Sequence, residues 1–565
     1  MRTPSFLSAE NATAPCVAFE DSHLLVVRKP AGWNTHAPTP FAGEGIYDWL
    51  RSRESRWASL SIIHRLDKET SGLLVFGKTT LANRSLTQQF SDRKVLKEYI
   101  LWTDAKPASE KLVTRSVIVR RGDRYEAVAH AREGSTAETH FVTLEKGSHW
   151  IVQARPITGR THQIRVHAAK EGFPVLGDQL YGGAPFHRMC LHSQVLAFDH
   201  PETGERMRFC WEPDFSAHPA AERRRAIIVP GQTSAFRAVH GAADGCPGWL
   251  VDRLGPYELS QSASLPGDSE LRDLPYAAQI GGSLDPEGRY HKILDRKVGV
   301  SAPEELHPLH VGGKLAPEAF PVVENGVSYE LSMNEGYSVG LFFDQRDNRR
   351  RLLTGYIAPG FVMKPVPPSA TLLNTFAYTC GFSLCGALGG YQCTSIDLSR
   401  KYLDWGRRNF EANGLDPAKH DWIYGDVINW LTRLAKKERK FDVVLLDPPT
   451  FSRSKEGRSF SAERDYGKLV ELAVALVAKG GVLFASTNAA RVEPEAFCAT
   501  VKDAVRAMRR TVGRSHFVPQ PPDFPITPKA PGYLKTFWVR LDTPVSGDLP
   551  QSDPILALPS DEHPD

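Results

Sequence analysis

The chain has 565 residues, of which 41% are hydrophobic and 24% charged, and its formal net charge is +4. This length exceeds what one hydrophobic core serves, so two or three domains are expected, and the composition is that of an ordinary globular protein. No apolar run approaches the ~18 residues of a membrane span, and the first residues lack the apolar core of a signal peptide. These features predict a cytoplasmic protein without a membrane partner.

Eight cysteines are scattered along the chain without a Cys-x-x-Cys pair. Even the cluster Cys380, Cys385 and Cys393 lacks metal-ligand spacing, so buried thiols in a reducing compartment are favoured and no metal site is predicted.

The first 218 residues alternate in the manner of β-strands, with few helices. Two short strands joined by a turn are predicted within 17–32, a strand at 71–79 and a helix at 80–95. Further strands are predicted at 97–104, 115–121, 137–146 and 149–156. The alternation of polar and apolar residues indicates a mainly antiparallel mixed sheet.

From residue 331 the pattern changes to apolar strands that alternate with amphipathic helices. Strands are predicted at 371–376, 393–398, 441–449 and 480–487, and helices at 400–413, 426–438 and 462–479. Ser399 is the predicted N-cap of the first of these helices. Such alternation is typical of a doubly wound, Rossmann-like sheet.

The changes in pattern also predict the domain boundaries. They are an α+β domain at 1–218, a linker at 219–232, a small α+β domain at 233–330, an α/β doubly wound domain at 331–545 and a disordered acidic tail at 546–565.

A charged motif, HRLDKETSG at 64–72, precedes the apolar strand of the first domain. Residues 51–97 around it hold ten Lys or Arg and four acidic residues. Such a cluster suits a phosphate backbone as well as it suits a solvated helix face. Asp67 is the single carboxylate between the cations of the motif, yet an isolated Asp in a loop most often caps a turn.

The motif and four further segments, in the same order along about 200 residues, resemble the RluA-type pseudouridine synthases. These segments are KPAGWNTHAP (29–38), KEYIL (97–101), TGRTHQIRVHAAKEGFPVLGDQLYGG (158–183) and LHSQVLAFDHPETGERMRFCWEPDF (191–215). The resemblance implies isomerisation of a uridine in RNA, without a cofactor, on a nucleotide turned out of its helix.

The resemblance assigns roles to four residues of the first domain. Asp67 becomes the essential carboxylate, acting at the ribose C1′ or on the C2′ proton, and Arg165 its charged partner. Tyr99 is expected to stack on the uracil, with a possible part in proton removal at C5, and Arg65 to help displace the nucleotide. Each of these residues, taken singly, is equally an ordinary turn, strand or surface residue.

The remaining cations and histidines near the motifs are expected to have simpler roles. Lys29, Lys68, Lys78 and Lys97 are expected to contact phosphate or solvent. The local histidines are expected to satisfy hydrogen bonds, because the family reaction needs no histidine acid–base pair.

The segment LLNTFAYTCGFSLCGALGG (372–390) resembles the first motif of class I S-adenosylmethionine methyltransferases, in the ribosomal-RNA branch with the RlmI- and RlmK-type enzymes. FRAVHGAADGCPGWLVDRLG (236–255) and ENGVSYELSMNEGYSVGLFFDQRDNRR (324–350) resemble the entries to that branch's central and catalytic domains. The resemblance implies S-adenosylmethionine as the cofactor of the third domain.

Cofactor-binding residues follow from these matches and from the ends of the predicted parallel strands. Asp397 is expected at the ribose hydroxyls, Asp426 at the adenine amino group, Gly381 at the closest backbone approach and Asp447 where substrate and cofactor meet. As loop acids, Asp397, Asp426 and Asp447 could alternatively be caps. The remaining residues assigned to the cofactor pocket are Asn374, Phe376, Tyr378, Gln345 and Arg346.

One departure from the branch bears on the methylated base. Cytosine-C5 members attack the base with a cysteine that follows a Gly-Gly strand, whereas Asn488 stands at that place here. Guanine N7 is already a nucleophile and needs only positioning. Guanine is therefore favoured over cytosine.

RNA is the expected partner, with large-subunit ribosomal RNA favoured and transfer RNA open for the first domain. The first domain is also expected to target the methyltransferase, because it occupies the place of the branch's usual RNA-binding domain. The alternatives are a cytosine-C5 enzyme, a degenerate methyltransferase fold used as a binding module, and a methyltransferase for small molecules or proteins. The oligomeric state does not follow from the sequence.

Overall fold

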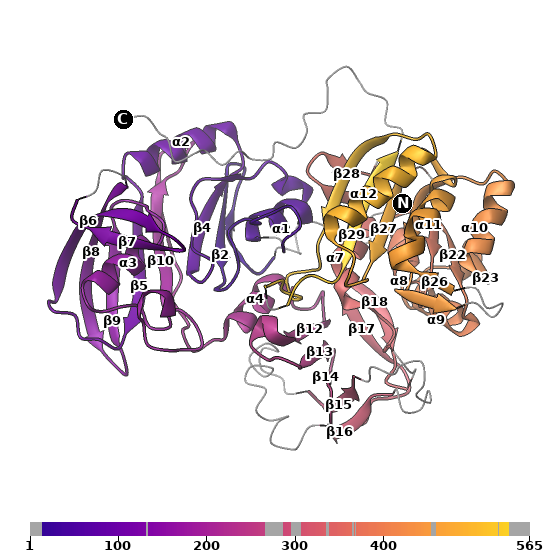
Figure 1. Ribbon diagram of the computed structural model, residues 1–565, viewed down its shortest axis with the longest axis horizontal. Helices are drawn as coiled ribbons and strands as arrows, with labels where there is room; N and C mark the ends of the chain where they lie inside the picture. Colours follow the sequence, from indigo (N-terminus) through magenta and orange to yellow (C-terminus); the bar gives the residue numbers. More distant parts are fainter. Residues whose placement is uncertain are drawn as a thin grey trace.

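The computed structural model contains three sheet-based units that follow one another along the chain (Figure 1). It describes residues 14–43, 45–130, 134–265, 286–294, 307–334, 338–363, 367, 369–453, 459–528 and 530–541. The expected acidic tail at 546–565 lies outside these residues. Among the described helices, none is long and apolar enough to cross a membrane.

The first unit is an 11-stranded mixed sheet with the central order β1-β2-β4-β10-β5-β9-β8-β6-β7. Its neighbouring strands are antiparallel except for the pair β4 and β10, so the predicted mixed, mainly antiparallel sheet is confirmed. The strands are β1 (Val17–Glu20), β2 (Leu24–Lys29), β3 (Ser61–Ile62), β4 (Ser71–Gly77), β5 (Leu96–Thr103), β6 (Lys111–Arg121), β7 (Arg124–Val128), β8 (Ser135–Lys146), β9 (Trp150–Pro156), β10 (Leu191–Asp199) and β11 (Arg206–Cys210).

Three helices accompany this sheet: α1 (Ile46–Arg53), α2 (Thr80–Ser91) and α3 (Gln163–Lys170). β4 is buried along its whole length, because apolar residues fill both of its faces. The Thr79 side chain caps α2 by accepting a hydrogen bond from the backbone of Ala82.

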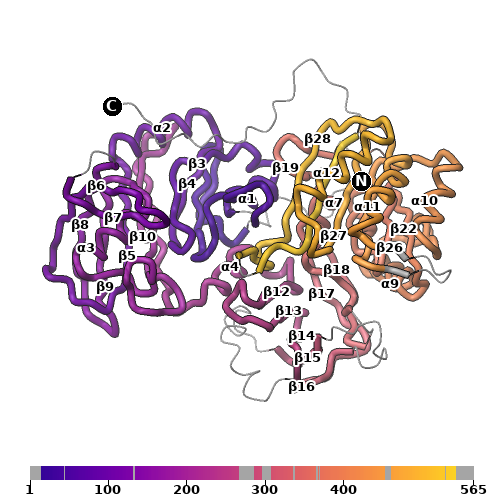
Figure 2. The backbone as a smooth tube through the Cα atoms, in the orientation of Figure 1, coloured from indigo at the N-terminus to yellow at the C-terminus, as the bar shows by residue number. Residues whose placement is uncertain are grey.

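The second unit is a five-stranded sheet of β12 (Ala235–His240), β13 (Leu250–Leu254), β14 (Tyr257–Ser262), β15 (Gly288–Ile293) and β16 (Leu309–Gly313). A hairpin of β17 (Phe320–Glu324) and β18 (Val327–Leu331) follows it. In Figure 2 this hairpin runs from the central unit up to the third one. Tyr329 in β18 belongs to the same core as Leu372 of the third unit, so the two units share buried apolar surface.

The third unit is the predicted doubly wound sheet, with strand order β23-β22-β21-β24-β27-β29-β28. The first five strands are parallel to one another, and β29 is antiparallel to both of its neighbours, β27 and β28. They are β21 (Thr371–Thr375), β22 (Gln392–Asp397), β23 (Asp421–Tyr424), β24 (Phe441–Leu446), β27 (Val477–Thr487), β28 (Val512–Val518) and β29 (Lys535–Leu541).

The helices of the third unit are α7 (Arg346–Thr354), α8 (Gly381–Leu388), α9 (Arg400–Ala412), α10 (Val427–Lys436), α11 (Ala462–Val474) and α12 (Pro494–Ala507). Ser399 caps α9 as predicted, accepting a hydrogen bond from the backbone of Tyr402. The helix predicted at 462–479 ends earlier, at Val474, because the following strand begins at Val477 and pairs with β24.

The segment expected to be a linker, 219–232, differs from that expectation. Residues Pro219–Ile227 form helix α4, and Arg224 within it is fully buried. The arginine run suggested a solvated spacer, but Arg223 contacts the first unit and Arg224 contacts the central and third units.

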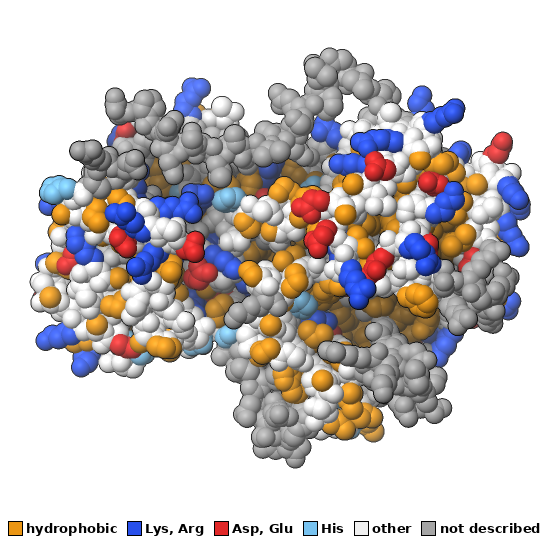
Figure 3. Space-filling model, viewed as in Figure 1, with side chains coloured by type: hydrophobic (Ala, Val, Ile, Leu, Met, Phe, Trp, Pro, Cys, Tyr) orange, Lys and Arg blue, Asp and Glu red, His pale blue; other side chains and the backbone are white. Residues whose placement is uncertain are grey.

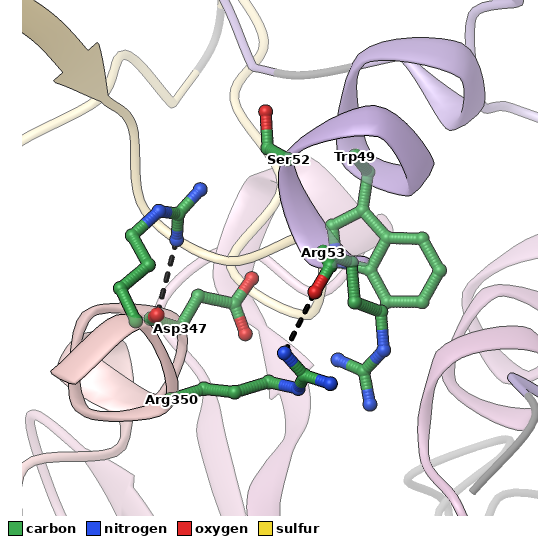
Figure 4. Close-up of a pocket in the computed structure, with 6 residues that line it drawn as sticks. Trp49, Ser52, Arg53, Asp347 and Arg350 are labelled. Carbon is green, nitrogen blue, oxygen red and sulfur yellow. Dashed lines mark hydrogen bonds between the residues drawn. The ribbon is translucent and has the colours of Figure 1, made fainter. Parts of the chain in front are cut away.

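The first and third units also touch directly, through α1 and the pair α7–β19 (Tyr356–Ala358). Arg350 donates a hydrogen bond to the backbone oxygen of Arg53 at 2.7 Å and forms an ion pair with Glu54 at 2.6 Å (Figure 4). Tyr356 donates to the backbone oxygen of Arg51 at 2.7 Å. A cavity of about 10 Å³ remains there between Trp49, Arg53 and Asp347, which is the room of one water molecule.

Candidate functional sites

The loop that carries Asp67 runs between β3 and β4, and hydrogen bonds from Thr35 and Lys29 hold its backbone. Thr35 donates to the backbone oxygen of Leu66 and accepts from its nitrogen, at 3.0 and 3.2 Å. Lys29 Nζ donates to the backbone oxygens of Trp33 and Lys68, at 2.7 and 3.0 Å. These bonds fix the backbone on both sides of Asp67.

Lys29 is a correction to the sequence analysis, which expected it to meet phosphate or solvent. Its side chain is fully buried, and burial lowers the pKa of its ammonium group to about 7. Its hydrogen bonds to three backbone oxygens, including that of Pro30 at 3.0 Å, are made inside the protein. The side chain is therefore a structural brace of the Asp67 loop.

Asp67 and Arg165 meet at the centre of this site, as the sequence analysis expected. Arg165 is buried in α3, and its Nη1 lies 3.4 Å from Asp67 Oδ2. The Asp67 side chain is 24% exposed, so it is reachable from solvent without projecting into it. His162 Nε2 lies 4.0 Å from the same oxygen.

Asp178 is a residue of the site that the sequence analysis missed. It binds Arg165 through two hydrogen bonds, of 2.6 Å from Nε and 2.9 Å from Nη2. Burial alone would lower the pKa of Arg165, but the Asp178 carboxylate raises it, with Asp67 acting in the same direction. Its place in LGDQLYGG, within a segment already matched to the family, was the available signal.

An open pocket of about 280 Å³ lies beside these residues, lined among others by His162, Arg165, Asp178 and Met189. Tyr99 is buried in β5, and burial raises the pKa of its phenol to about 12, with the Asp67 charge adding to the effect. The phenol thus stays protonated at neutral pH, which argues against proton removal by a phenolate. Arg65 is exposed next to Asp67.

The second candidate site lies at the carboxyl ends of β21, β22 and β24. Asp397 ends β22 and accepts hydrogen bonds from the backbone nitrogens of Tyr378 and Ser399, both at 2.8 Å. Burial raises the pKa of Asp397, and these two bonds oppose that rise. The carboxylate therefore ties the loop after β21 to the end of β22.

The loop after β21 has an unusual backbone. Phe376, Tyr378 and Cys380 all have positive φ, at 55°, 48° and 61°, which non-glycine residues rarely adopt. Asn374, before the loop, is buried and donates to Ser383 Oγ at 2.9 Å. Gly381 itself starts α8, and a Cβ there would lie 3.1 Å from Leu341 Cδ1, so close packing inside the protein also requires a small residue.

Asp447 and Gln345 face each other from different parts of the third unit. Gln345 Nε2 donates to Asp447 Oδ2 at 3.2 Å and to Ser486 Oγ at 2.9 Å. Burial raises the pKa of Asp447 to about 6, with the Asp344 charge adding to the effect. The strand ends of β24 and β27 thus meet at one polar cluster, of which Ser486 was not expected.

Two further residues assigned to the cofactor have partners within the protein. Arg346 forms two hydrogen bonds with Asp523, of 2.7 and 2.6 Å, and both side chains are buried, so its guanidinium supports the fold around the pocket. Asp426 caps α10 by accepting from the backbone of Asn429 at 2.9 Å. The cap matches the alternative that the sequence analysis left open for this residue.

Asn488 lies at the end of β27, beside the segment that follows Asp447. Its Oδ1 accepts a hydrogen bond from Thr450 Oγ1 at 2.5 Å, and both residues are exposed. The four cysteines of the third unit, Cys380, Cys385, Cys393 and Cys498, are all buried. A cysteine nucleophile is therefore missing from the described exposed surface of this unit.

The side chains around the second site suit an adenosine-type cofactor. The Asp397 carboxylate is a group that can accept hydrogen bonds from ribose hydroxyls. Leu398 and Phe342 are 48% and 47% exposed and present apolar surface, and the rings of Phe342 and Tyr378 lie 5.3 Å apart. A flat adenine ring would cover such apolar surface from water.

Both regions match protein-family models. Residues 23–170 match the RNA pseudouridylate synthase model, and residues 288–540 match the S-adenosylmethionine-dependent methyltransferase model.

Relatives of both kinds are known. Ribosomal RNA large subunit methyltransferase I of Klebsiella pneumoniae is 31% identical over 368 residues, which are 65% of this chain and 87% of the relative. Ribosomal large subunit pseudouridine synthase C of Yersinia pestis is 37% identical over 212 residues, 35% of this chain and 65% of the relative. YwbD of Bacillus subtilis is 35% identical over 270 residues, 48% of this chain and 64% of YwbD.

The chain thus spans slightly less than two thirds of the latter two relatives. It spans well over that share of the Klebsiella protein, at more than 30% identity. The chain therefore belongs to the family of S-adenosylmethionine-dependent ribosomal RNA large subunit methyltransferases and carries, ahead of that region, a domain of the RNA pseudouridylate synthase family.

Proposed function

We propose that the chain is a bifunctional RNA-modifying enzyme, which isomerises a uridine to pseudouridine and methylates a base with S-adenosylmethionine. The observation that supports the first activity most strongly is the Asp67–Arg165–Asp178 arrangement beside an open pocket. The observation behind the second is the Asp397 and Asp447 pair at neighbouring strand ends of a doubly wound sheet.

At the first site, the Asp67 carboxylate acts on the ribose of a uridine turned out into the pocket. The Arg165 guanidinium faces this carboxylate at 3.4 Å, and Asp178 holds the guanidinium in place. The Tyr99 ring, neutral at physiological pH, offers a stacking surface for the uracil.

At the second site, Asp397 and the loop at 376–380 would hold the cofactor, which supplies an electrophilic methyl group. Asp447 accepts hydrogen bonds, so it can orient the amino group of a base against that methyl. Gln345 and Ser486 keep the Asp447 carboxylate in place. A ring nitrogen that already has a free lone pair loses no proton when it is methylated. The protein therefore only has to position the base.

Guanine is the base that we propose for methylation. Thr450 and Asn488 present a hydroxyl and an amide at the strand ends, where a covalent mechanism would require a thiolate. Amide and hydroxyl groups can pair with the edge of a purine. Ribosomal RNA of the large subunit is the proposed substrate, with transfer RNA a further possibility for the first domain.

We further propose that the partner is RNA and that the protein is cytoplasmic. Figure 3 shows a hollow between the first unit and the other two, bordered by Lys and Arg side chains and also by Asp and Glu side chains. Positive side chains of this kind attract the phosphate backbone. Mass mapping of ribosomal RNA from cells with and without the gene tests the whole proposal. RNA from cells without the gene should lack one pseudouridine and one methyl group, at nearby nucleotides.

The proposed chemistry predicts that RNA containing 5-fluorocytidine is not trapped covalently by this protein. A cysteine-dependent C5 enzyme forms an adduct that such a base cannot release, whereas an enzyme without that thiolate forms none. Denaturing electrophoresis of the protein with labelled RNA and S-adenosylmethionine measures the adduct. A shifted, cofactor-dependent band would contradict the assignment of guanine.

Asp178→Asn is expected to lower kcat for pseudouridine formation by about ten- to a hundredfold, with little change in KM. The reason is that a charge-assisted hydrogen bond contributes about 1.5–3 kcal/mol, and Arg165 would lose its orienting anion. Steady-state kinetics on an RNA substrate measures both constants. The matched control is Asp123→Asn on the exposed β6–β7 turn, and an Asp178 variant within twofold of the wild type would refute this role.

A further inference from the structure

Helix α4 contacts the first domain through two adjacent residues. Glu222 accepts a hydrogen bond from the backbone nitrogen of Ala31 at 3.1 Å, and Arg223 donates to the backbone oxygen of Gly32 at 2.6 Å. Arg188 of the first domain also binds Glu222, at 2.8 Å. Both ends of the turn at 31–32 are therefore held by the helix.

This turn is continuous with the brace of the first active site. It is separated by Pro30 alone from Lys29, whose ammonium group donates to the backbone oxygens of Trp33 and Lys68. Lys68 is the neighbour of Asp67. A displacement of the turn would therefore move the backbone that positions the carboxylate.

The next residue of α4 contacts the rest of the molecule. Arg224 is fully buried and donates two hydrogen bonds to Asp244 of the central unit, at 2.9 and 2.5 Å. The same guanidinium donates to the backbone oxygen of Asp523 at 2.6 Å and to that of Arg237 at 3.0 Å. One side chain thus joins the central unit to the segment between β28 and β29.

Asp523 is connected to the second active site through Arg346 and Gln345. Its carboxylate is fully buried and binds Arg346 through two hydrogen bonds of 2.7 and 2.6 Å. Arg346 is the neighbour of Gln345, which donates to Asp447. Asp523, Arg346 and Gln345 are all buried, and in such surroundings a lost partner is costly, so the geometry is strongly specified.

We propose that α4 is a shared positioning element for the two active sites, and that Arg224 is the residue that links them. Glu222 and Arg223 hold the turn at 31–32, on which the position of Asp67 depends. Arg224 holds Asp523, on which the positions of Gln345 and Asp447 depend. Arg224 touches neither pocket and acts through other residues. The kinetic tests of this inference rest on the proposed function, whereas the hydrogen-exchange test rests on the structure alone.

The physical argument is that a helix moves as a rigid unit. Successive residues 222, 223 and 224 point to different partners, so a shift that relieves one contact strains the others. A flexible linker would allow the two domains to work independently. A fragment that begins at residue 225 would lack the Arg224 side chain, so its second site would be disturbed.

The test compares Arg224→Lys with Arg225→Lys in the full-length protein. Lys keeps a positive charge next to Asp244, but it cannot reproduce the guanidinium contacts with Asp244 and Asp523 together. Arg225 lies on the same helix and is exposed, which makes it the matched control. Pseudouridine formation, methyl transfer and S-adenosylmethionine binding are measured well below the unfolding temperature of each variant.

The expected result for Arg224→Lys is a fall of about tenfold in kcat for both reactions, with faster amide hydrogen exchange at 29–33 and at 519–524. Arg225→Lys should stay within twofold of the wild type in every measurement. Glu222→Gln should affect pseudouridine formation more than methyl transfer. A purely structural role would lower the unfolding temperature of Arg224→Lys and leave kcat unchanged.

Two outcomes would overturn the proposal: an Arg224→Lys protein with one of the two reactions at the wild-type rate, or faster exchange at one of the two segments alone. Should the wild type itself lack either reaction, the proposed function fails. The hydrogen-exchange comparison then still decides whether α4 couples the two regions.

Discussion

Asp67→Asn is expected to abolish pseudouridine formation, by a factor of about 10²–10⁴ or more, and to leave methyl transfer unchanged. Asn has the size of Asp and can accept a hydrogen bond from Arg165, so the loop held by Lys29 and Thr35 should stay in place. It cannot serve as an anionic nucleophile or base. The reaction is measured by mass spectrometry of the RNA product.

The methyltransferase reaction of the same variant is its internal control, because the Asp67 side chain makes no contact with the third domain in the described residues. A thermal unfolding curve equal to that of the wild type shows that the fold persists. If Asp67→Asn kept more than a tenth of the wild-type rate, the assignment of the catalytic carboxylate would be wrong.

Methyl transfer is expected to fall as the pH drops through about 6, and to approach a tenfold loss per pH unit below it. Burial raises the pKa of Asp447 to about 6, and the nearby Asp344 carboxylate adds to this, whereas Arg349 opposes it. Only the ionised carboxylate can accept hydrogen bonds with both oxygens. Initial rates between pH 5 and 8 at saturating cofactor measure this dependence.

The effect of pH on stability at Asp447 has the opposite sign to its effect on the rate. Because the pKa of Asp447 is higher in the folded state than in the unfolded state, its contribution to stability is present at low pH and is lost as the pH rises through about 6. Circular dichroism at each pH separates the two effects. The methyl-transfer rate of Asp447→Asn should be lower than that of the wild type and independent of pH between 5 and 7. If the variant keeps the pH dependence, a group other than Asp447 causes it.

The elements that could be predicted from the sequence are those with strong periodicity. The apolar runs of β4 and β24 identified buried strands, and Ser399 identified the start of α9. Local hydrophobic pattern and capping chemistry act over a few residues, so they are visible without the rest of the chain. Asp67, Arg165 and Asp447 were found through resemblance to known families, because each lies in a motif that such a family shares.

The segments that could not be predicted depend on partners far away in the chain. Helix α4 resembles a spacer in its composition, yet Arg224 meets a backbone oxygen 299 residues later. Arg346 was assigned to the cofactor, but its carboxylate partner lies 177 residues away. Ion-pair partners at such separations leave no periodic trace in the sequence.

The sequence by itself determined the classes of fold, the order of the domains and the two motif sets that carry the proposed chemistry, since these rest on local residue patterns. Tertiary structure alone decided that Lys29 is a buried brace, that Asp178 orients Arg165, and that α4 lies between both sites. The physical reason is burial: a charged side chain has the same sequence signature in water as in a core, and only its surroundings decide which partners it must have.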